Sequence, residues 1–186
     1  MGAVKPQEYI LKDGRRATIR SAQISDAEGV LEQIKSVFAE SEYTVTIIDD
    51  DMSDFTVDKG KEWINKHIEQ PGHLFIVAEV DGRIVGSADL HNGNRKRIQH
   101  VGTLGITVIK DFRGLGVGKA LMEALLNWAL DNPLIEKIGL EVFDVNKPAI
   151  ELYNKLGFIE EGRKAKGIKL GQDSYVDSIL MYKFIE

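Results

Sequence analysis

The chain has 186 residues, of which 43% are hydrophobic and 28% charged, and its formal net charge is −5. These values are typical of one globular domain with a sizeable core. The acidic balance argues against a nucleic-acid surface, because proteins that bind phosphate backbones usually carry a basic stripe. With no cysteine, the chain has neither a disulfide nor a cysteine nucleophile. We expect a single domain, residues 1–186, without a nucleic-acid partner.

The N-terminal part of the chain predicts a strand followed by a helix. The segment MGAVKPQEYILKDG lacks the apolar core of a secretory signal, and no apolar run approaches membrane-spanning length. We therefore expect a cytoplasmic protein without a membrane partner. Residues 17–23, ATIRSAQ, alternate as a strand does, and Ser25 or Asp26 then offers an N-cap for a helix to about Glu40.

Residues 41–58 lack a steady period and predict a long loop, which in a compact domain is usually functional or mobile. Its acidic segment 49–54, DDDMSD, has two interpretations: attraction of a cationic amine, or a solvated surface. A helix then begins near residue 58 and ends at Pro71 and Gly72.

The rest of the chain predicts a mixed α/β (α+β) fold. Strands at 74–80, 83–91 and 98–109 form an antiparallel meander, the first two joined by the hairpin signal Asp81-Gly82. The basic cluster 95–97 fits a solvated turn better than a polyanion site. A helix to about Leu130, a strand at 137–143, a helix at 148–156 and two closing strands follow, near 158–167 and 174–184. A right-handed crossover makes strands 101–109 and 137–143 parallel.

Three alternate glycines, Gly114, Gly116 and Gly118, lie where a strand passes into a helix. Such a turn presents backbone amides at the positive end of a helix, where phosphate binds. The segment lacks the glycine spacing of a P-loop and of a dinucleotide fingerprint. The alternative is a tight turn that uses glycine only for its backbone freedom. We favour the anion-binding interpretation.

Two segments of the chain carry a family resemblance: RGLGVG, residues 113–118, and LEVFDVNKPAIELYNKLGF, residues 140–158. The first resembles the acyl-CoA pyrophosphate loop of the GNAT superfamily of N-acetyltransferases, and the second resembles the other signature of that superfamily. The resemblance implies a GNAT-like fold, with a mostly antiparallel sheet that splays at a parallel strand pair and about four helices. It also implies acetyl-CoA (coenzyme A) as co-substrate. RIQHVGTLGITV and the C-terminal segment resemble the branch that acetylates amino acids or other small amines.

The resemblance assigns roles to particular residues. Tyr153 is the implied acid that protonates the departing thiolate; the alternative is a core aromatic residue. Asn146 contacts the CoA arm in the family, and its position also suits a helix cap. No metal site is expected. The residues expected to bind the cofactor are Ile106, Thr107, Val108, Arg113, Gly114, Leu115, Gly116, Val117, Gly118, Lys119 and Asn146.

The general base is left unassigned. The candidates are Glu79, His91, His100, Glu141 and Asp177. The family resemblance favours acetyl transfer to the primary amine of a small molecule. Two alternatives remain, acetylation of a protein N-terminus or lysine and an acyl-CoA sensor without turnover, although a sensor has no need of Tyr153.

The last strand, within SYVDSILMYKFIE, is rich in apolar residues. At a sheet edge it would be an aggregation hazard, so we expect a homodimer with Ile179, Met181 and Phe184, or their neighbours, near a two-fold axis. The alternative is a monomer whose final strand is inserted within its own sheet.

Overall fold

A computed structural model describes residues 3–40, 42–45, 50, 53 and 55–186. Among these residues, no helix combines the length and the apolar character needed to cross a membrane. The helices are α1 (Ala27–Glu40), α2 (Val57–Glu69), α3 (Val117–Leu130) and α4 (Lys147–Lys155), with short 3-10 turns at Ile24–Asp26 and Lys110–Phe112. The strands are β1 (Gln7–Ile10), β2 (Arg16–Ser21), β3 (Leu74–Val80), β4 (Arg83–Asn92), β5 (Val101–Val108), β6 (Lys137–Phe143), β7 (Ile159–Lys169) and β8 (Tyr175–Phe184).

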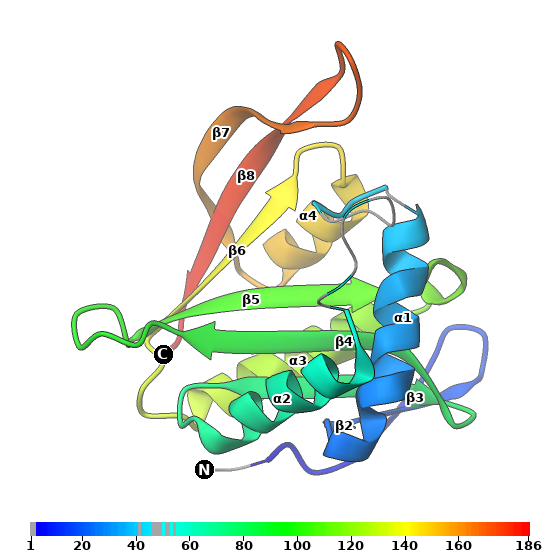
Figure 1. Ribbon diagram of the computed structural model, residues 1–186. Helices are drawn as coiled ribbons and strands as arrows, with labels where there is room; N and C mark the ends of the chain where they lie inside the picture. The colour runs from blue at the N-terminus through cyan, green and yellow to red at the C-terminus, as the bar shows by residue number, and fades with distance from the viewer. Residues whose placement is uncertain (1–2, 41, 46–49, 51–52, 54) are drawn as a thin grey trace.

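The strands form one mixed sheet in the order β1-β2-β3-β4-β5-β6-β8-β7. The pair β5 and β6 is parallel, and the other described neighbours are antiparallel. Helices α1 and α2 lie on one face of the sheet, and α3 and α4 lie on the other (Figure 1). The predicted mixed α/β class, the four helices and the parallel pair are confirmed.

The parallel pair is short. Val101–Thr103 of β5 pair with Lys137–Gly139 of β6, and the two strands separate beyond these residues. The far part of β6 continues to pair with β8, and β6, β7 and β8 lean away from β5 as a separate wing of the sheet (Figure 1). The edge of β5 from Leu104 to Val108 therefore faces a gap in the sheet, as the family resemblance predicted.

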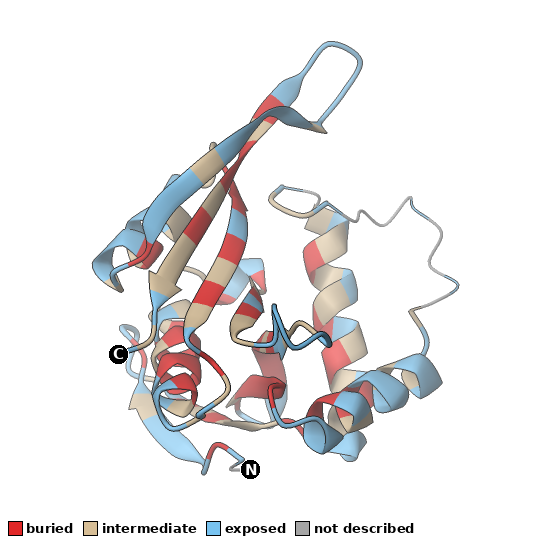
Figure 2. Cartoon of the chain, turned by 90° about the vertical axis from the view of Figure 1, so that its left-hand side faces the viewer, coloured by how far each residue is buried: buried red, intermediate tan, exposed pale blue. Residues whose placement is uncertain are grey.

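Helix α3 anchors the centre of the fold because it is buried on most of its surface (Figure 2). Its polar side chains Lys119, Glu123 and Asn127 recur every four residues, which places them on one stripe, and Lys119 pairs with Glu123 there. At Gly86 of β4, an added Cβ would lie 3.0 Å from the Thr107 carbonyl oxygen and 3.2 Å from Leu121. A glycine at this point lets the helix, β4 and β5 approach closely.

The structure corrects two expectations. Strand β1 was not predicted, because four mostly exposed residues carry little hydrophobic pattern. The last strand was expected at a sheet edge, but β8 lies between β6 and β7, and Ile179 and Met181 are buried in the core. The edge strand on this side of the sheet is β7, which is rich in lysine and glutamate, residues that discourage pairing between sheets. The edge argument for a homodimer is therefore wrong, and the homodimer itself stays a prediction.

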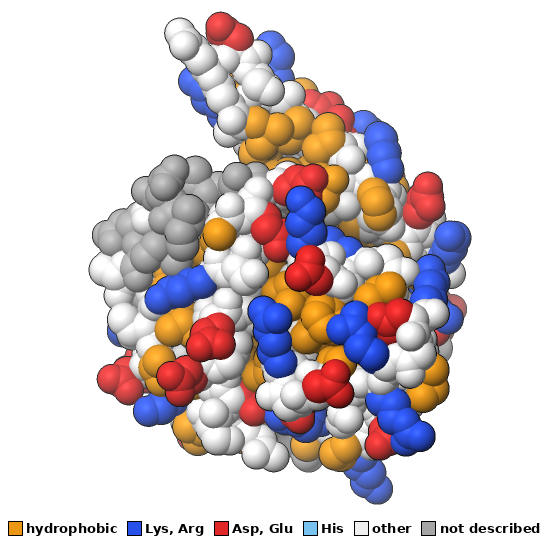
Figure 3. Space-filling view, turned by 90° about the vertical axis from the view of Figure 1, so that its right-hand side faces the viewer, with side chains coloured by type: hydrophobic (Ala, Val, Ile, Leu, Met, Phe, Trp, Pro, Cys, Tyr) orange, Lys and Arg blue, Asp and Glu red, His pale blue; other side chains and the backbone are white. Residues whose placement is uncertain are grey.

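Charged side chains are interspersed on the face shown in Figure 3, where Lys and Arg alternate with Asp and Glu around a hydrophobic area.

One ion-pair network links β2, the turn before α1 and β3. Arg20 donates to Asp26 at 2.7 and 2.9 Å and to Glu79 at 2.8 and 3.2 Å, and the Arg20 side chain is only 17% exposed. Burial alone would raise the pKa of Asp26, but hydrogen bonds from Arg20 and the Gln23 amide hold it below its ordinary value.

We expect Arg20→Met to lower the free energy of unfolding by about 2 kcal/mol at neutral pH, because two carboxylates are left without their partner. The lowered pKa of Asp26 means that the wild-type pair stabilises the fold above the unfolded pKa of about 4 and less so as the pH falls through the folded pKa. The difference between wild type and variant should thus shrink in acid. Urea unfolding at several pH values measures it.

The control is Arg16→Met, which removes an exposed pair with Glu8 and should cost less than about 0.5 kcal/mol. Equal losses in the two variants, or a loss at Arg20 that does not depend on pH, would contradict this account of the network.

Candidate active site

The glycine loop between β5 and α3 has the backbone that its sequence suggested. Gly114 and Gly116 have φ values of +71° and +106°, a region that disfavours residues with a Cβ. An added Cβ at either position would meet no heavy atom within 4 Å, so both point into open space. Gly116 precedes the first turn of α3, and the described residues supply that turn with no side-chain cap and no acidic residue. The backbone amides of this first turn of α3 therefore suit the binding of an anion.

Neighbouring segments hold this loop in place. The Lys12 amide donates to the Leu115 carbonyl at 3.0 Å. An added Cβ at Gly118 would lie 3.7 Å from the Leu152 side chain, so the start of α3 lies beside α4. The loop therefore lies close to the helix that carries Tyr153.

The structure places the Arg113 guanidinium at the C-terminal end of α1, and the predicted contact of Arg113 with the cofactor stays a prediction. Its Nε donates to the Val108 carbonyl at 3.0 Å, and its terminal nitrogens pair with Glu42 at 3.2 Å and with Glu40. The Lys110 amide donates to Glu40 as well, at 3.1 Å. Arg113 thus ties the glycine loop to the end of α1. Sequence analysis missed this contact, because nothing local connects residues so far apart in the chain.

The hydrogen bond from Arg113 also shows how the edge of β5 is oriented. The carbonyl and the amide of one strand residue point to the same neighbour, and the direction alternates along the strand. The Val108 carbonyl accepts from Arg113, and the Ile109 amide donates in the opposite direction, to the Val85 carbonyl of β4. The amides of Val108 and Ile106 therefore face the gap between β5 and β6. They are available to an extended ligand that pairs as a strand would.

Thr107 lies between Ile106 and Val108, and its side chain contacts α1 and β4. Its hydroxyl accepts from the Gln33 amide at 3.1 Å and lies 3.1 Å from the Ser87 hydroxyl, which donates to the Gln33 side-chain oxygen at 2.9 Å. Gln33 and Ser87 are buried. This closed network joins α1, β4 and β5 beneath a cavity.

The cavity of about 570 Å³ lies between α1, α2, β4 and β5. Ser87, Asp89 and Thr107 provide its polar side chains on the sheet, and Lys59, Glu62 and Lys66 of α2 contribute charge. Gly105 and Ile106 of β5 line it as well. The apolar wall includes Val30, Leu31, Ile34, Phe38, Phe55, Trp63 and Phe75. A mainly apolar cavity with a few polar groups is typical of a small-molecule site.

Asn146 and Tyr153 belong to α4 and its cap. The Asn146 side chain accepts from the Ala149 amide at 3.3 Å, so its capping role is confirmed, while its contact with the CoA arm stays a prediction. Tyr153 is 6% exposed and packs 6.0 Å from the Phe158 ring, between ring centroids. Burial raises the pKa of Tyr153 to about 12. The phenol therefore keeps its proton at neutral pH, as a proton donor must.

The five candidate bases do not meet in the cavity. Glu79 pairs with Arg20, and Glu141 pairs with Lys164 and accepts from Ser178. Asp177 accepts from the Lys166 amide, while His91 contacts Asp89. None of the five, His100 included, is among the described residues that line the cavity. Asp89 does line it, and its alternation with Ser87 along β4 was a signal that sequence analysis did not use. Most of the acidic segment 49–54 lies outside the described residues.

The split mixed sheet, with a glycine loop that leads into a buried helix beside the split, defines the fold of the GNAT acetyltransferases. The family model described as "Acetyltransferase (GNAT) family" matches residues 41–158. The chain belongs to this family, and the protein is an acetyltransferase.

Three relatives illustrate the similarity. The L-amino acid N-acetyltransferase AaaT of Escherichia coli (strain K12) is 37% identical over 120 residues, which are 64% of this chain and 73% of the relative. An N-alpha-acetyltransferase of Sulfurisphaera tokodaii is 27% identical over 173 residues, 89% of this chain and 93% of the relative. The crystal structure of a GNAT-family acetyltransferase from Streptococcus pneumoniae superposes with a TM-score of 0.85 at 28% identity, covering 91% of this chain and 99% of the other.

Proposed function

We propose that this enzyme transfers the acetyl group of acetyl-CoA to the primary amine of a small molecule, with amino acids and related amines as the substrate class. The observation that supports the proposal is that β5 borders both the gap in the sheet and the cavity. One edge of this strand presents the amides of Ile106 and Val108 to the gap in the sheet, and Gly105, Ile106 and Thr107 line the cavity. A donor along the edge and an acceptor in the cavity would meet at the same strand.

On the donor side, the residues present fit a CoA molecule, which supplies the activated thioester. The amides of residues 114–119, with the open space at Gly114 and Gly116, would hold the pyrophosphate. The gap-facing amides of β5 would pair with the pantetheine arm and polarise the thioester carbonyl. Asn146 would contact that arm beside its capping role, and Arg113 would position the loop through its hold on α1.

The transfer requires that the amine nitrogen attack the thioester carbonyl carbon and that the carbon–sulfur bond break. The sulfur then takes a proton, for which we propose the Tyr153 phenol. Its burial keeps the phenol protonated but also makes it a weaker acid, so the proton transfer requires that the thiolate form in the same dry surroundings, where its own pKa is raised as well. The proton that the amine releases goes to a base that we leave unassigned.

On the acceptor side, the cavity favours an amine that carries an apolar group. The apolar wall from α1, α2 and β3 would contact the hydrocarbon part, while the polar groups on β4 and β5 face the reacting end. AaaT, a relative named as an L-amino acid N-acetyltransferase, supports the same substrate class.

Purified enzyme, acetyl-CoA and a panel of free amino acids and small amines test the function, with release of free thiol and the mass of the product as readouts. We expect turnover with apolar amino acids. A second panel of peptides with free N-termini tests the alternative that the N-alpha-acetyltransferase relative suggests. Turnover of peptides alone would replace the small-molecule proposal, and CoA binding without any turnover would favour a sensor.

We expect Gly116→Glu to abolish CoA binding, because its carboxylate would occupy the open space where the pyrophosphate is proposed. Gly116→Gln is the matched control, since it brings the same bulk and the same backbone strain at φ +106° without the charge. Calorimetry should find CoA affinity lower for the Glu variant by on the order of 100-fold relative to the Gln variant. If both folded variants bind CoA as tightly as the wild-type enzyme does, the pyrophosphate does not lie at this loop.

We expect Tyr153→Phe to lower kcat by about 100-fold, the size typical of a lost general acid, and to change CoA affinity by less than about threefold. Tyr175→Phe, at an exposed position on β8, is the control and should retain full turnover. Stopped-flow detection of free thiol measures the rate. Near wild-type turnover in the Tyr153 variant would make this residue a core aromatic and assign the proton to another group.

The homodimer and the cytoplasmic location remain predictions of the sequence. Light scattering of the purified enzyme decides the first, and a constant monomer mass would exclude the dimer.

A further inference from the structure

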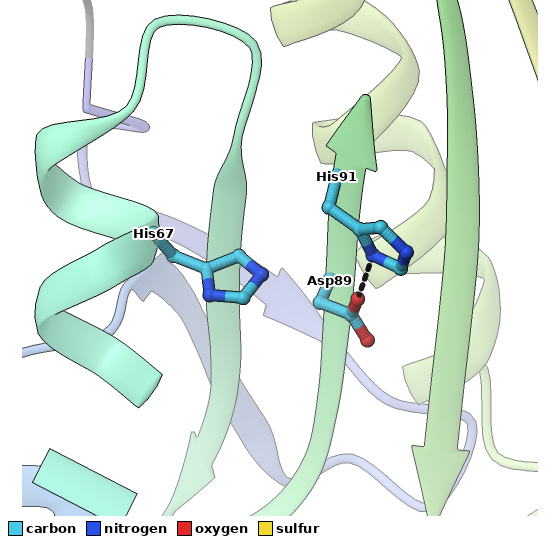
Figure 4. A group of neighbouring side chains, drawn as sticks. All are labelled: His67, Asp89 and His91. Carbon is cyan, nitrogen blue, oxygen red and sulfur yellow. Dashed lines mark hydrogen bonds and ion pairs between the residues drawn. The ribbon is translucent and has the colours of Figure 1, made fainter. Parts of the chain in front are cut away.

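Beyond acetyl transfer, we propose that His67, Asp89 and His91 form a binding site for a divalent transition-metal ion, with Zn²⁺ as the expected ion. The three side chains come from α2 and β4, and their ligand atoms all lie within 4.8 Å of one another (Figure 4). The proposal departs from the expectation, drawn from the sequence, that the protein has no metal site. It does not depend on the proposed substrate.

The His67 ring has the protonation pattern of a metal ligand. Its Nδ1 lies 2.9 Å from the Trp63 carbonyl oxygen, which can only accept, so Nδ1 carries the proton and Nε2 carries a lone pair. The residue is 5% exposed, and Nε2 is buried without a hydrogen-bond partner among the described residues. A buried polar atom without a partner calls for an explanation such as an absent ion. A histidine that donates one nitrogen to a carbonyl and offers the other is typical of metal ligands.

The side chains of His67, Asp89 and His91 converge on one point. Figure 4 shows a ring nitrogen of His67 pointing across toward Asp89 and His91, which lie on the facing strand. The Nδ1 atom of His91 is 3.2 Å from an Asp89 carboxylate oxygen. Ligands about 2.0–2.1 Å from a tetrahedral zinc are separated by roughly 3.3 Å, so this pair already has a suitable spacing.

Little movement is required to bring the ligand atom of His67 as close to those of Asp89 and His91 as a shared metal ion needs. His67 is fixed by its bond to Trp63 and by ring contacts with Trp63 and Phe75, at 4.1 and 6.0 Å between centroids. The His91 side chain is 50% exposed and can turn toward it. Two imidazoles and one carboxylate are ligands that zinc and neighbouring transition metals accept, and three protein ligands leave a further position open. Asp89 also lines the cavity, so the ion would lie at its margin.

The test uses untagged, full-length enzyme freed of metal with a chelator and then titrated with ZnCl₂ by calorimetry. We expect one ion per chain. Loss of an outer partner alone weakens metal binding by roughly 10- to 100-fold, so His91→Ala and Asp89→Asn, which remove direct ligands, should weaken it at least as much. His67→Gln should have the same effect. His100→Ala is the matched control, a histidine outside the cluster, and should bind zinc as wild type does.

Cobalt provides a second readout. Co²⁺ bound to the enzyme should give visible absorption that disappears in His91→Ala, a variant at an exposed position that is expected to fold normally. Circular dichroism checks the fold of each variant. The proposal is overturned if wild-type enzyme binds no zinc, if His91→Ala and Asp89→Asn bind it as tightly as wild type, or if His100→Ala weakens it equally.

Discussion

The early separation of β5 from β6 determines where the rest of the site lies. These strands pair over three residues on each side and then diverge, because β6 continues with β8 in a wing that leans away. Within the described part of the chain, the backbone groups of β5 beyond Thr103 consequently have no strand partner on that edge. A strand edge left open inside a fold is a hazard unless something pairs with it, and an extended ligand meets that need. The acetyltransferase fold thus contains an open edge by construction.

The position of the glycine loop follows from the burial of α3. The helix is fixed against the sheet by an apolar surface that covers most of its circumference, so its first turn has a defined place. Two contacts then fix the loop before it: Leu115 accepts from the Lys12 amide, and Arg113 pairs with Glu40 and Glu42 at the end of α1. Backbone amides that are held in advance bind an anion without the cost of ordering them.

The polar side chains of β4 that face α1 and α2 have separate tasks. Ser87 closes a network with Gln33 and Thr107 at the base of the cavity. Asp89 lines the cavity beyond it, packed so tightly on β5 that an added Cβ at Gly105 would lie 2.6 Å from its carboxylate oxygen. His91 follows at the exposed end. The alternation of a strand places all three on the same face, so one segment of β4 serves both the acceptor cavity and the proposed metal site.

Local patterns in the sequence were sufficient to predict most of the secondary structure and the glycine loop of this protein. Hydrophobic periodicity predicted the four helices, the meander and the crossover, and the positive φ values of Gly114 and Gly116 agree with the use of glycine there. These features depend on neighbours in the chain. The insertion of β8 inside the sheet, the pairing of Arg113 with α1 and the approach of His67 to Asp89 join residues distant in sequence. Only tertiary structure decides them, because the same local pattern is compatible with several long-range packings.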